Sequence, residues 1–291
     1  MKRTWVDPPL VAVREVVARA LAEDFGVQGD LTAGLVGDDA TVEAVLVARK
    51  DGVLAGRLAA HEAFLAVDPG VLVSWSLSDG DALTRGTVIG RVQGRLSSVL
   101  SAERTALNLL CHLSGIATST RRYVEAAGAA SKIRDTRKTT PGLRALEKAA
   151  VRAGGGVNHR ASLSDAILVK DNHLAGIGIE RAVALAHERW PGVTCEVECD
   201  TLDQVRTALA AGADMILLDN MTPPEVAVAV GVVAGRVKVE VSGGVTLDTV
   251  GDYASAGADL ISVGAITHSA PILDIGLDLD PEVSRCWLPS T

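Results

Sequence analysis

The chain has 291 residues, 48% of them hydrophobic, and a formal net charge of −8. This length is enough for one large domain or two smaller ones with a well-buried core. The acidic balance argues against a general nucleic-acid or membrane-surface binder, so we expect no nucleic acid and no membrane among its partners. No apolar run approaches the roughly 20 residues of a membrane span, and the first residues lack an apolar signal core. We therefore expect a cytoplasmic protein.

The first part of the chain mixes helices with short strands. Apolar residues at helical spacing predict an amphipathic helix over 10–24, and a strand rich in Val and Ala follows at 41–49. A second helix is expected near 58–66, before short strands at 71–77 and 87–92 that an S-D-G-D turn separates. This mixture predicts a small α+β domain.

A long helical pattern over 101–127 separates the two halves, and Gly115 within it leaves open two helices in tandem. We place the domain boundary here. The N-terminal α+β domain would cover 1–115 and the second domain 116–269. The tail, 270–291, is predicted to pack on the N-terminal domain.

From residue 133 onward, strands alternate with Ala-rich helices. Six strands are expected, and the last five end at intervals of 28, 21, 23 and 22 residues between Lys170 and Gly264. This rhythm is typical of consecutive βα units with a parallel sheet. The unbroken order and the missing dinucleotide-binding glycine motif favour a barrel over a doubly wound sheet. Because six strands fall short of eight, we predict an incomplete TIM-like α/β barrel.

Four of these strands are apolar in the middle and end in a polar residue: Lys170, Glu198, Asp219 or Ser242. In a parallel barrel these ends open on one face, which carries active sites. We therefore expect Lys170, Glu198 and Asp219 to meet Lys138 in one pocket. A structural ion pair would explain any one of them alone, but their matching positions favour a functional site.

Two basic loops suggest an anionic ligand. Arg137 and Lys138 follow the first barrel strand, and G-G-G-V-N-H-R (154–160) ends in His159 and Arg160. Arg offers a planar fork and Lys a compact point charge to carboxylate or phosphate. Nine Lys and Arg face three acids between positions 132 and 170 of this acidic chain, which favours a small polyanion over a polymer. Each loop alone is also compatible with a solvated basic connector.

The strand ends also suggest phosphate and metal binding. Ser242 precedes Gly243, and Gly264 precedes His268 by four residues; glycines there let backbone N–H groups approach a phosphate. Glu198 and Asp219 are hard oxygen donors of the kind that Mg²⁺ accepts, often through water. They are equally suited to accept hydrogen bonds from sugar hydroxyls, so both roles stay open.

Nine segments of the chain carry a family resemblance: E-D-F-G-V-Q-G-D-L-T (23–32), A-E-R-T-A-L-N-L-L-C-H-L-S-G-I-A-T (102–118), D-T-R-K-T-T-P-G-L-R (135–144), G-G-V-N-H-R (155–160), K-D-N-H (170–173), E-V-E-C-D (196–200), L-L-D-N (217–220), E-V-S-G-G (240–244) and S-A-P-I-L-D-I-G-L-D (269–278). On these segments the chain resembles the quinolinate phosphoribosyltransferase family over nearly its whole length. No charged site position departs from the family pattern.

The resemblance implies a pentosyltransferase that moves phosphoribose from phosphoribosyl pyrophosphate to the ring nitrogen of quinolinate. Pyrophosphate leaves and the 2-carboxylate is lost as CO₂, which gives nicotinate mononucleotide for NAD synthesis. The resemblance also implies an N-terminal sandwich domain, an incomplete barrel, and a homodimer in which Arg104 reaches the neighbour's pocket.

The family pattern assigns roles to this chain's residues. Quinolinate would contact Arg104, Arg137, Lys138, His159, Arg160 and Lys170. Phosphoribosyl pyrophosphate, with Mg²⁺, would contact Lys138, Lys170, Glu198, Asp219, Ser242, Gly243, Gly264 and His268. The catalytic residues would be Lys138, Lys170, Glu198 and Asp219. These cations suit the negative charge that builds on departing pyrophosphate.

Three alternatives remain at this point. A barrel lyase or aldolase would use Lys170 as a Schiff base. A phosphosugar or nucleotide binding protein without turnover would not explain so many convergent charges. A transferase acting on nicotinate is disfavoured because Arg104, Arg137, His159 and Arg160 exceed what one carboxylate needs.

Overall fold

A computed structural model of the chain describes residues 7–36, 40–174 and 176–279. The chain forms two compact units, each assembled from separate stretches of sequence. Unit 1 comprises Met1–Ser119, Thr140–Gly155 and Ala270–Thr291, and unit 2 comprises Thr120–Thr139 and Gly156–Ser269. Among the described residues, no helix combines the length and the apolar character that a membrane crossing requires.

Unit 1 contains an antiparallel sheet in the order β12-β1-β5-β3. Its strands are β1 (Thr41–Ala48), β3 (Leu72–Trp75), β5 (Val88–Arg95) and β12 (Ile275–Leu279). A separate ladder pairs β2 (Gly52–Val53) with β4 (Ala82–Leu83). Alternate residues of β1 are buried, as expected of a strand with one face on a core. Strand β12 pairs with β1, which brings the described part of the tail onto the N-terminal sheet; residues 280–291 lie outside the described residues.

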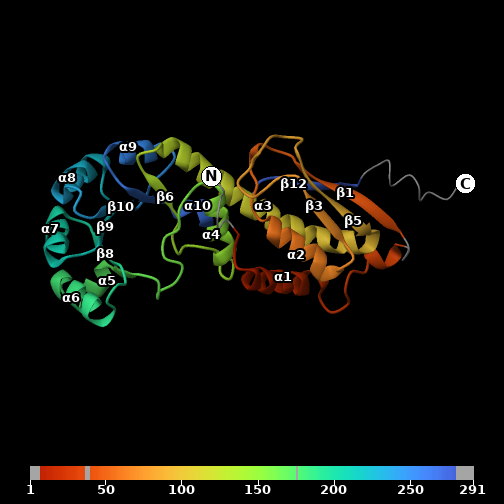
Figure 1. The fold of residues 1–291 in the computed structure, drawn as a ribbon, viewed down its shortest axis with the longest axis horizontal. Helices are drawn as coiled ribbons and strands as arrows, with labels where there is room; N and C mark the ends of the chain where they lie inside the picture. The colour runs from red at the N-terminus through yellow and green to blue at the C-terminus, as the bar shows by residue number, and fades with distance from the viewer. Residues whose placement is uncertain (1–6, 37–39, 175, 280–291) are drawn as a thin grey trace, which may run out of the picture. The chain divides into compact units, whose positions relative to one another are not determined.

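The helices of unit 1 are α1 (Leu10–Phe25), the 3₁₀ turn η1 (Ala33–Leu35), α2 (Arg57–Val67), the first part of α3 (Leu96–Ala127) and α4 (Arg144–Ala153). Helices α1 and α2 lie side by side (Figure 1). The suggested tandem pair is instead one continuous helix, α3. A Cβ at Gly115 would lie 2.1 Å from the Pro271 carbonyl oxygen, so the glycine permits a close chain crossing and does not mark a helix break.

Unit 2 is built on six parallel strands in the order β6-β11-β10-β9-β8-β7. They are β6 (Lys132–Arg134), β7 (Ile167–Val169), β8 (Cys195–Cys199), β9 (Met215–Asp219), β10 (Lys238–Ser242) and β11 (Leu260–Ser262). Strands β6 and β7 are the two edge strands of this sheet, so it does not close on itself. The predicted incomplete α/β barrel is therefore confirmed. Along the other edge of β6, Val157 bridges to Arg134 and donates its N–H to the Ile133 carbonyl at 2.8 Å. The second basic loop is thereby held at the mouth of the barrel.

Helices connect these strands: α5 (Asp171–Leu174), α6 (Ile179–Arg189), α7 (Leu202–Ala211), α8 (Pro223–Val233), α9 (Val250–Ser255) and α10 (Ala265–His268). Helices α6, α7 and α8 lie outside the strands of unit 2 (Figure 1). Capping boxes at Thr201 and Thr222 begin α7 and α8 directly after the strands. Within a strand, successive side chains alternate in direction, so Val197 and Val241 pack away from the side that carries Glu198 and Ser242.

Candidate active site

A cavity of about 300 Å³ opens in unit 2 at the carboxyl ends of the parallel strands. It is lined by Thr136, Arg137, Lys138, His159, Arg160, Leu168, Lys170, Glu198, Leu217, Asp219, Glu240, Ser242 and Ser262. Eight of these are residues that the sequence singled out: Arg137, Lys138, His159, Arg160, Lys170, Glu198, Asp219 and Ser242. Residues from five strands, β7 to β11, and from the two basic loops therefore share one opening, as the strand-end pattern predicts.

The two glycine turns lie close against this opening. A Cβ at Gly264 would lie 3.2 Å from both His268 Nε2 and Lys138 Cδ, so these three predicted residues meet. Thr267 Oγ1 donates to the Lys138 carbonyl at 2.8 Å and so fixes α10 behind the basic loop. Gly243 has φ +92°, and a Cβ there would lie 2.2 Å from Asn220 Oδ1. Only glycine fits that turn.

Arg104 lies on α3 in unit 1. Its predicted reach into a neighbouring subunit's pocket stays a prediction, as do the individual roles of the residues around the cavity.

Two of the lining residues form an ion pair. Lys170 Nζ donates to Glu198 Oε2, and Asn220 Nδ2 donates to Asp219 Oδ2 at 2.6 Å. Glu198 and Asp219 end adjacent strands, β8 and β9, and both line the cavity. Two carboxylates on one wall, with space in front of them, fit the water- and phosphate-assisted coordination that Mg²⁺ prefers.

Two guanidinium groups, those of Arg137 and Arg160, also line the cavity. Burial lowers the pKa of Arg160, and the nearby charge of Arg137 lowers it further, against the opposing effect of Glu196 and Asp165. An arginine remains protonated even so. Arg160 Nη1 donates to the Ala166 carbonyl at 3.1 Å. Two cations held near each other favour an anionic ligand that contacts both.

A second row of polar side chains, on β6, β8, β10 and β11, lies beside the strand-end residues, and the sequence interpretation missed it. Arg134 and Ser262 both donate to Glu240, which is fully buried. His159 Nε2 lies 3.1 Å from Glu196 Oε2 and 3.7 Å from Glu240 Oε1. The signal was available, because Glu196 and Glu240 precede Glu198 and Ser242 by two positions and so share their face.

Burial controls the protonation of this row. It raises the pKa of Glu240 to about 7, where Glu196 adds to the shift and Arg134 opposes it. Burial also raises the pKa of Glu196. His159, Glu196 and Glu240 have metal-binding atoms within 4.8 Å of one another. Because Glu196 and Glu240 are buried while Glu198 and Asp219 are partly exposed at the cavity, Glu198 and Asp219 are the better candidates for magnesium donors.

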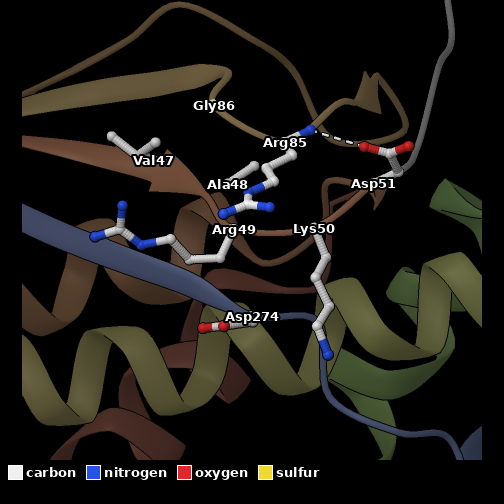
Figure 2. Close-up of a pocket in the computed structure, with 8 residues that line it drawn as sticks. All are labelled: Val47, Ala48, Arg49, Lys50, Asp51, Arg85, Gly86 and Asp274. Atoms are coloured by element: carbon white, nitrogen blue, oxygen red, sulfur yellow. Dashed lines mark hydrogen bonds between the residues drawn. The ribbon is translucent and has the colours of Figure 1, made fainter.

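Unit 1 has a larger cavity of about 730 Å³ between the end of β1 and the turn before β5. Figure 2 shows Arg49, Lys50 and Arg85 around it with two acids, Asp51 and Asp274. The backbone N–H of Arg85 donates to Asp51 at 2.7 Å. No residue that the sequence assigned to the site lines this cavity, so its size does not make it the candidate active site.

The fold and the cavity first define a class: an incomplete α/β barrel with cationic and acidic side chains around a cavity at the carboxyl ends of its strands. Two family models then match the chain. The model described as "Quinolinate phosphoribosyl transferase, N-terminal domain" matches residues 30–114, and the one described as "Quinolinate phosphoribosyl transferase, C-terminal domain" matches residues 116–278.

Similar proteins agree with these matches. "Nicotinate-nucleotide pyrophosphorylase [carboxylating]" of Mycobacterium leprae is 45% identical over 277 residues, covering 92% of this chain and 97% of its own. The "Probable nicotinate-nucleotide pyrophosphorylase [carboxylating]" of Bacillus subtilis is 42% identical over 270 residues, with coverage of 92% and 93%. The nicotinate-nucleotide pyrophosphorylase structure from Francisella tularensis superposes with a TM-score of 0.90 at 38% identity, covering 94% of this chain and 98% of that one. The chain belongs to the quinolinate phosphoribosyltransferase family.

Proposed function

We propose that this protein transfers phosphoribose from phosphoribosyl pyrophosphate to quinolinate, with loss of CO₂. The products are nicotinate mononucleotide and pyrophosphate, as a step of de novo NAD synthesis. One observation carries the proposal: Lys138, Lys170, Glu198 and Asp219 line a single cavity that also holds Arg137 and Arg160. Relatives named for this activity cover nearly the whole chain.

The two guanidinium groups that line the cavity suit quinolinate. Its two neighbouring carboxylates match the two forks of Arg137 and Arg160, which repel each other without an anion. Nicotinate has one carboxylate and would leave one of these cations uncompensated. The site therefore favours the diacid.

The strand-end row suits the sugar and its leaving group. Lys138 and Lys170 bring positive charge to the departing pyrophosphate, while Glu198 and Asp219 stabilise positive charge at the anomeric carbon. Ser242, Gly243, Gly264 and His268 would hold phosphate oxygens. No covalent nucleophile is needed, because holding two anionic substrates in contact is the main difficulty.

Mg²⁺ is proposed as the cofactor, held by Glu198 and Asp219 directly or through water. When bound, it supplies positive charge to phosphate oxygens. Binding of Mn²⁺ as a paramagnetic substitute, followed by water proton relaxation, tests this without an activity assay. The D219N variant should bind Mn²⁺ more weakly than wild type, and equal binding would contradict the assignment.

Decarboxylation requires a positive ring nitrogen, which the transfer itself produces. The hypothesis is that the protein contributes little more than orientation to this step. A substitution of Arg137 that still forms a nucleotide but retains the carboxylate would contradict this hypothesis.

A homodimer is also proposed, with Arg104 donated to the neighbour's cavity. Mixing the R104A and D219N variants tests it, because only a mixed dimer has one site with both residues intact. After random exchange, half of the dimers are mixed, so about one quarter of wild-type activity should return. If Arg104 acts within its own chain, no activity returns.

A cytoplasmic location is proposed from the cysteines. Cys111, Cys195 and Cys199 are free and buried, and burial raises the pKa of Cys199 to about 12. Unreactive packing thiols of this kind are typical of proteins in reducing compartments.

Pyrophosphate release in a coupled assay tests the function directly. Release should require both quinolinate and phosphoribosyl pyrophosphate, and nicotinate should replace quinolinate poorly. Borohydride trapping of a carbonyl substrate on Lys170, without pyrophosphate release, would favour the Schiff-base alternative.

A further inference from the structure

We propose that His173 is a positioning residue for Lys170: its neutral imidazole caps the short helix α5 in place of the lysine side chain, which is thereby left to face the cavity. This inference rests on the proposed function, in which Lys170 contacts substrate. Among the residues of the K-D-N-H segment (170–173), the family resemblance assigned a role to Lys170 alone.

His173 and Lys170 form two hydrogen bonds at the start of α5. Lys170 directly precedes the helix, so it occupies the N-cap position, and His173 is the third helical residue. The backbone N–H of Lys170 donates to His173 Nδ1 at 3.0 Å, and the backbone N–H of His173 donates to the Lys170 carbonyl at 2.9 Å. A ring nitrogen that accepts an N–H carries no proton, so the imidazole proton lies on Nε2.

The helices that follow β8 and β9 show what this arrangement replaces. In α7 the backbone N–H of Thr201 donates to Gln204 at 3.0 Å, and in α8 the backbone N–H of Thr222 donates to Glu225 at 2.8 Å. In both helices the threonine side chain also accepts from the N–H of the third residue, which completes a capping box. At α5 the N-cap residue is Lys170, whose side chain has no acceptor, and its carbonyl accepts that N–H instead.

This exchange leaves the ammonium of Lys170 available to the cavity. Lys170 lines the cavity, and its Nζ donates to Glu198. The ladder between β7 and β8 ends at Val169, so strand pairing does not hold Lys170, and its side chain is 42% exposed. His173 therefore fixes the main chain from which the ammonium extends. A small displacement of a group that contacts substrate is enough to lower a rate strongly.

The first test reads the tautomer of His173 by NMR of the full chain labelled with ¹⁵N-histidine, with the H173Q spectrum assigning the signal. At neutral pH, Nδ1 should be unprotonated and Nε2 protonated, both in the free protein and with quinolinate and pyrophosphate added. A proton on Nδ1 in either state overturns the proposal. The free protein can be read without turnover, so this result is separate from failure of the proposed function.

The second test compares variants by kcat/KM for pyrophosphate release. His173→Ala should lower kcat/KM by about tenfold, because the main chain of Lys170 loses its anchor. His173→Gln should recover most of this loss, since a glutamine at the same helical position accepts the N-cap N–H in α7.

Gln204→Ala is the matched control, because it removes the corresponding side-chain acceptor at α7. It should lower the urea midpoint about as much as His173→Ala does, while its kcat/KM stays within about twofold of wild type. Equal activity losses in H173A and H173Q, or in H173A and Q204A, would overturn the proposal, as would wild-type activity in H173A. Wild-type protein that releases no pyrophosphate would contradict the proposed function instead, and the NMR result would then decide the role of His173.

Discussion

The barrel mouth of unit 2 carries two rows of polar side chains, and on β8 and β10 the members of the two rows lie two residues apart. The outer row, Lys170, Glu198, Asp219 and Ser242, borders the cavity and is partly exposed. The inner row is Arg134, Glu196, Glu240 and Ser262; the last three are buried, and the Arg134 side chain is 15% exposed. Arg134 and Ser262 both donate to Glu240, and Glu196 Oε2 lies 3.1 Å from His159 Nε2. The outer row can exchange its partners for substrate groups. The inner row cannot do so without leaving a buried charge unpaired.

Substitution in the basic loop beside the outer row gives the largest expected effect. K138A should lower kcat/KM by on the order of 10²- to 10³-fold, because it removes a cation from the developing negative charge. Its unfolding free energy should change by less than about 1 kcal/mol, since the residue is exposed. The matched control is K238A at the opposite end of β10, where Lys238 pairs with Asp259 on the surface. Equal activity losses in the two variants would contradict the strand-end site.

Substitution in the inner row should instead act mainly on the unfolding free energy. E240A leaves the Arg134 guanidinium buried without its carboxylate, which should cost about 3 kcal/mol of unfolding free energy in urea titrations. E240Q keeps an oxygen that accepts from Arg134, so it should lower the unfolding free energy by less than E240A does. If E240A were as stable as wild type, the inner row would not be the structural element described.

The inner row also predicts a pH dependence. The folded-state pKa of Glu240, about 7, lies above the unmodified value of 4.5, so the folded state binds the extra proton in that interval. Stability should therefore fall as pH rises from about 4.5 to 7, by on the order of 2 to 3 kcal/mol. The measurement is the difference in unfolding free energy between wild type and E240Q at several pH values. A difference that is constant with pH would contradict the raised pKa.

The smallest effect on activity is expected from a substitution in α10, behind the loop that carries Lys138. T267V removes the hydrogen bond from Oγ1 to the Lys138 carbonyl while it keeps the shape of the buried side chain. Activity should fall by only a few-fold, consistent with about 1 kcal/mol for one hydrogen bond. A loss as large as that of K138A would show that loop position matters more than charge.

The outer row was predictable from the sequence, and the inner row was not predicted. Both outcomes follow from relying on one pattern, in which a strand is apolar in the middle and polar at its end. Strands that are apolar in the middle and polar at the end predict a parallel barrel with its chemistry at one edge. That interpretation treated Glu196 and Glu240 as part of apolar strands, although their period-two spacing placed them on the cavity face. Buried carboxyls are unusual because each needs a charged partner, and Arg134 belongs to a strand far away in sequence.

Short elements and close crossings were also hard to predict. Helices α5 and α10 have four residues each, too few to show helical periodicity. Strand β6 ends at Arg134, two residues before the predicted end, because Asp135 turns to hold the loop of Asn158 and His159. Gly115 suggested a break in α3 because the close approach of Pro271 cannot be seen in the sequence.

Release of ¹⁴CO₂ from quinolinate labelled in its 2-carboxylate tests the central claim most directly. With phosphoribosyl pyrophosphate and Mg²⁺ present, wild-type protein should release label in step with pyrophosphate, and K138A should release it far more slowly. Folded wild-type protein that releases no label, or that converts nicotinate as fast as it converts quinolinate, would contradict the account.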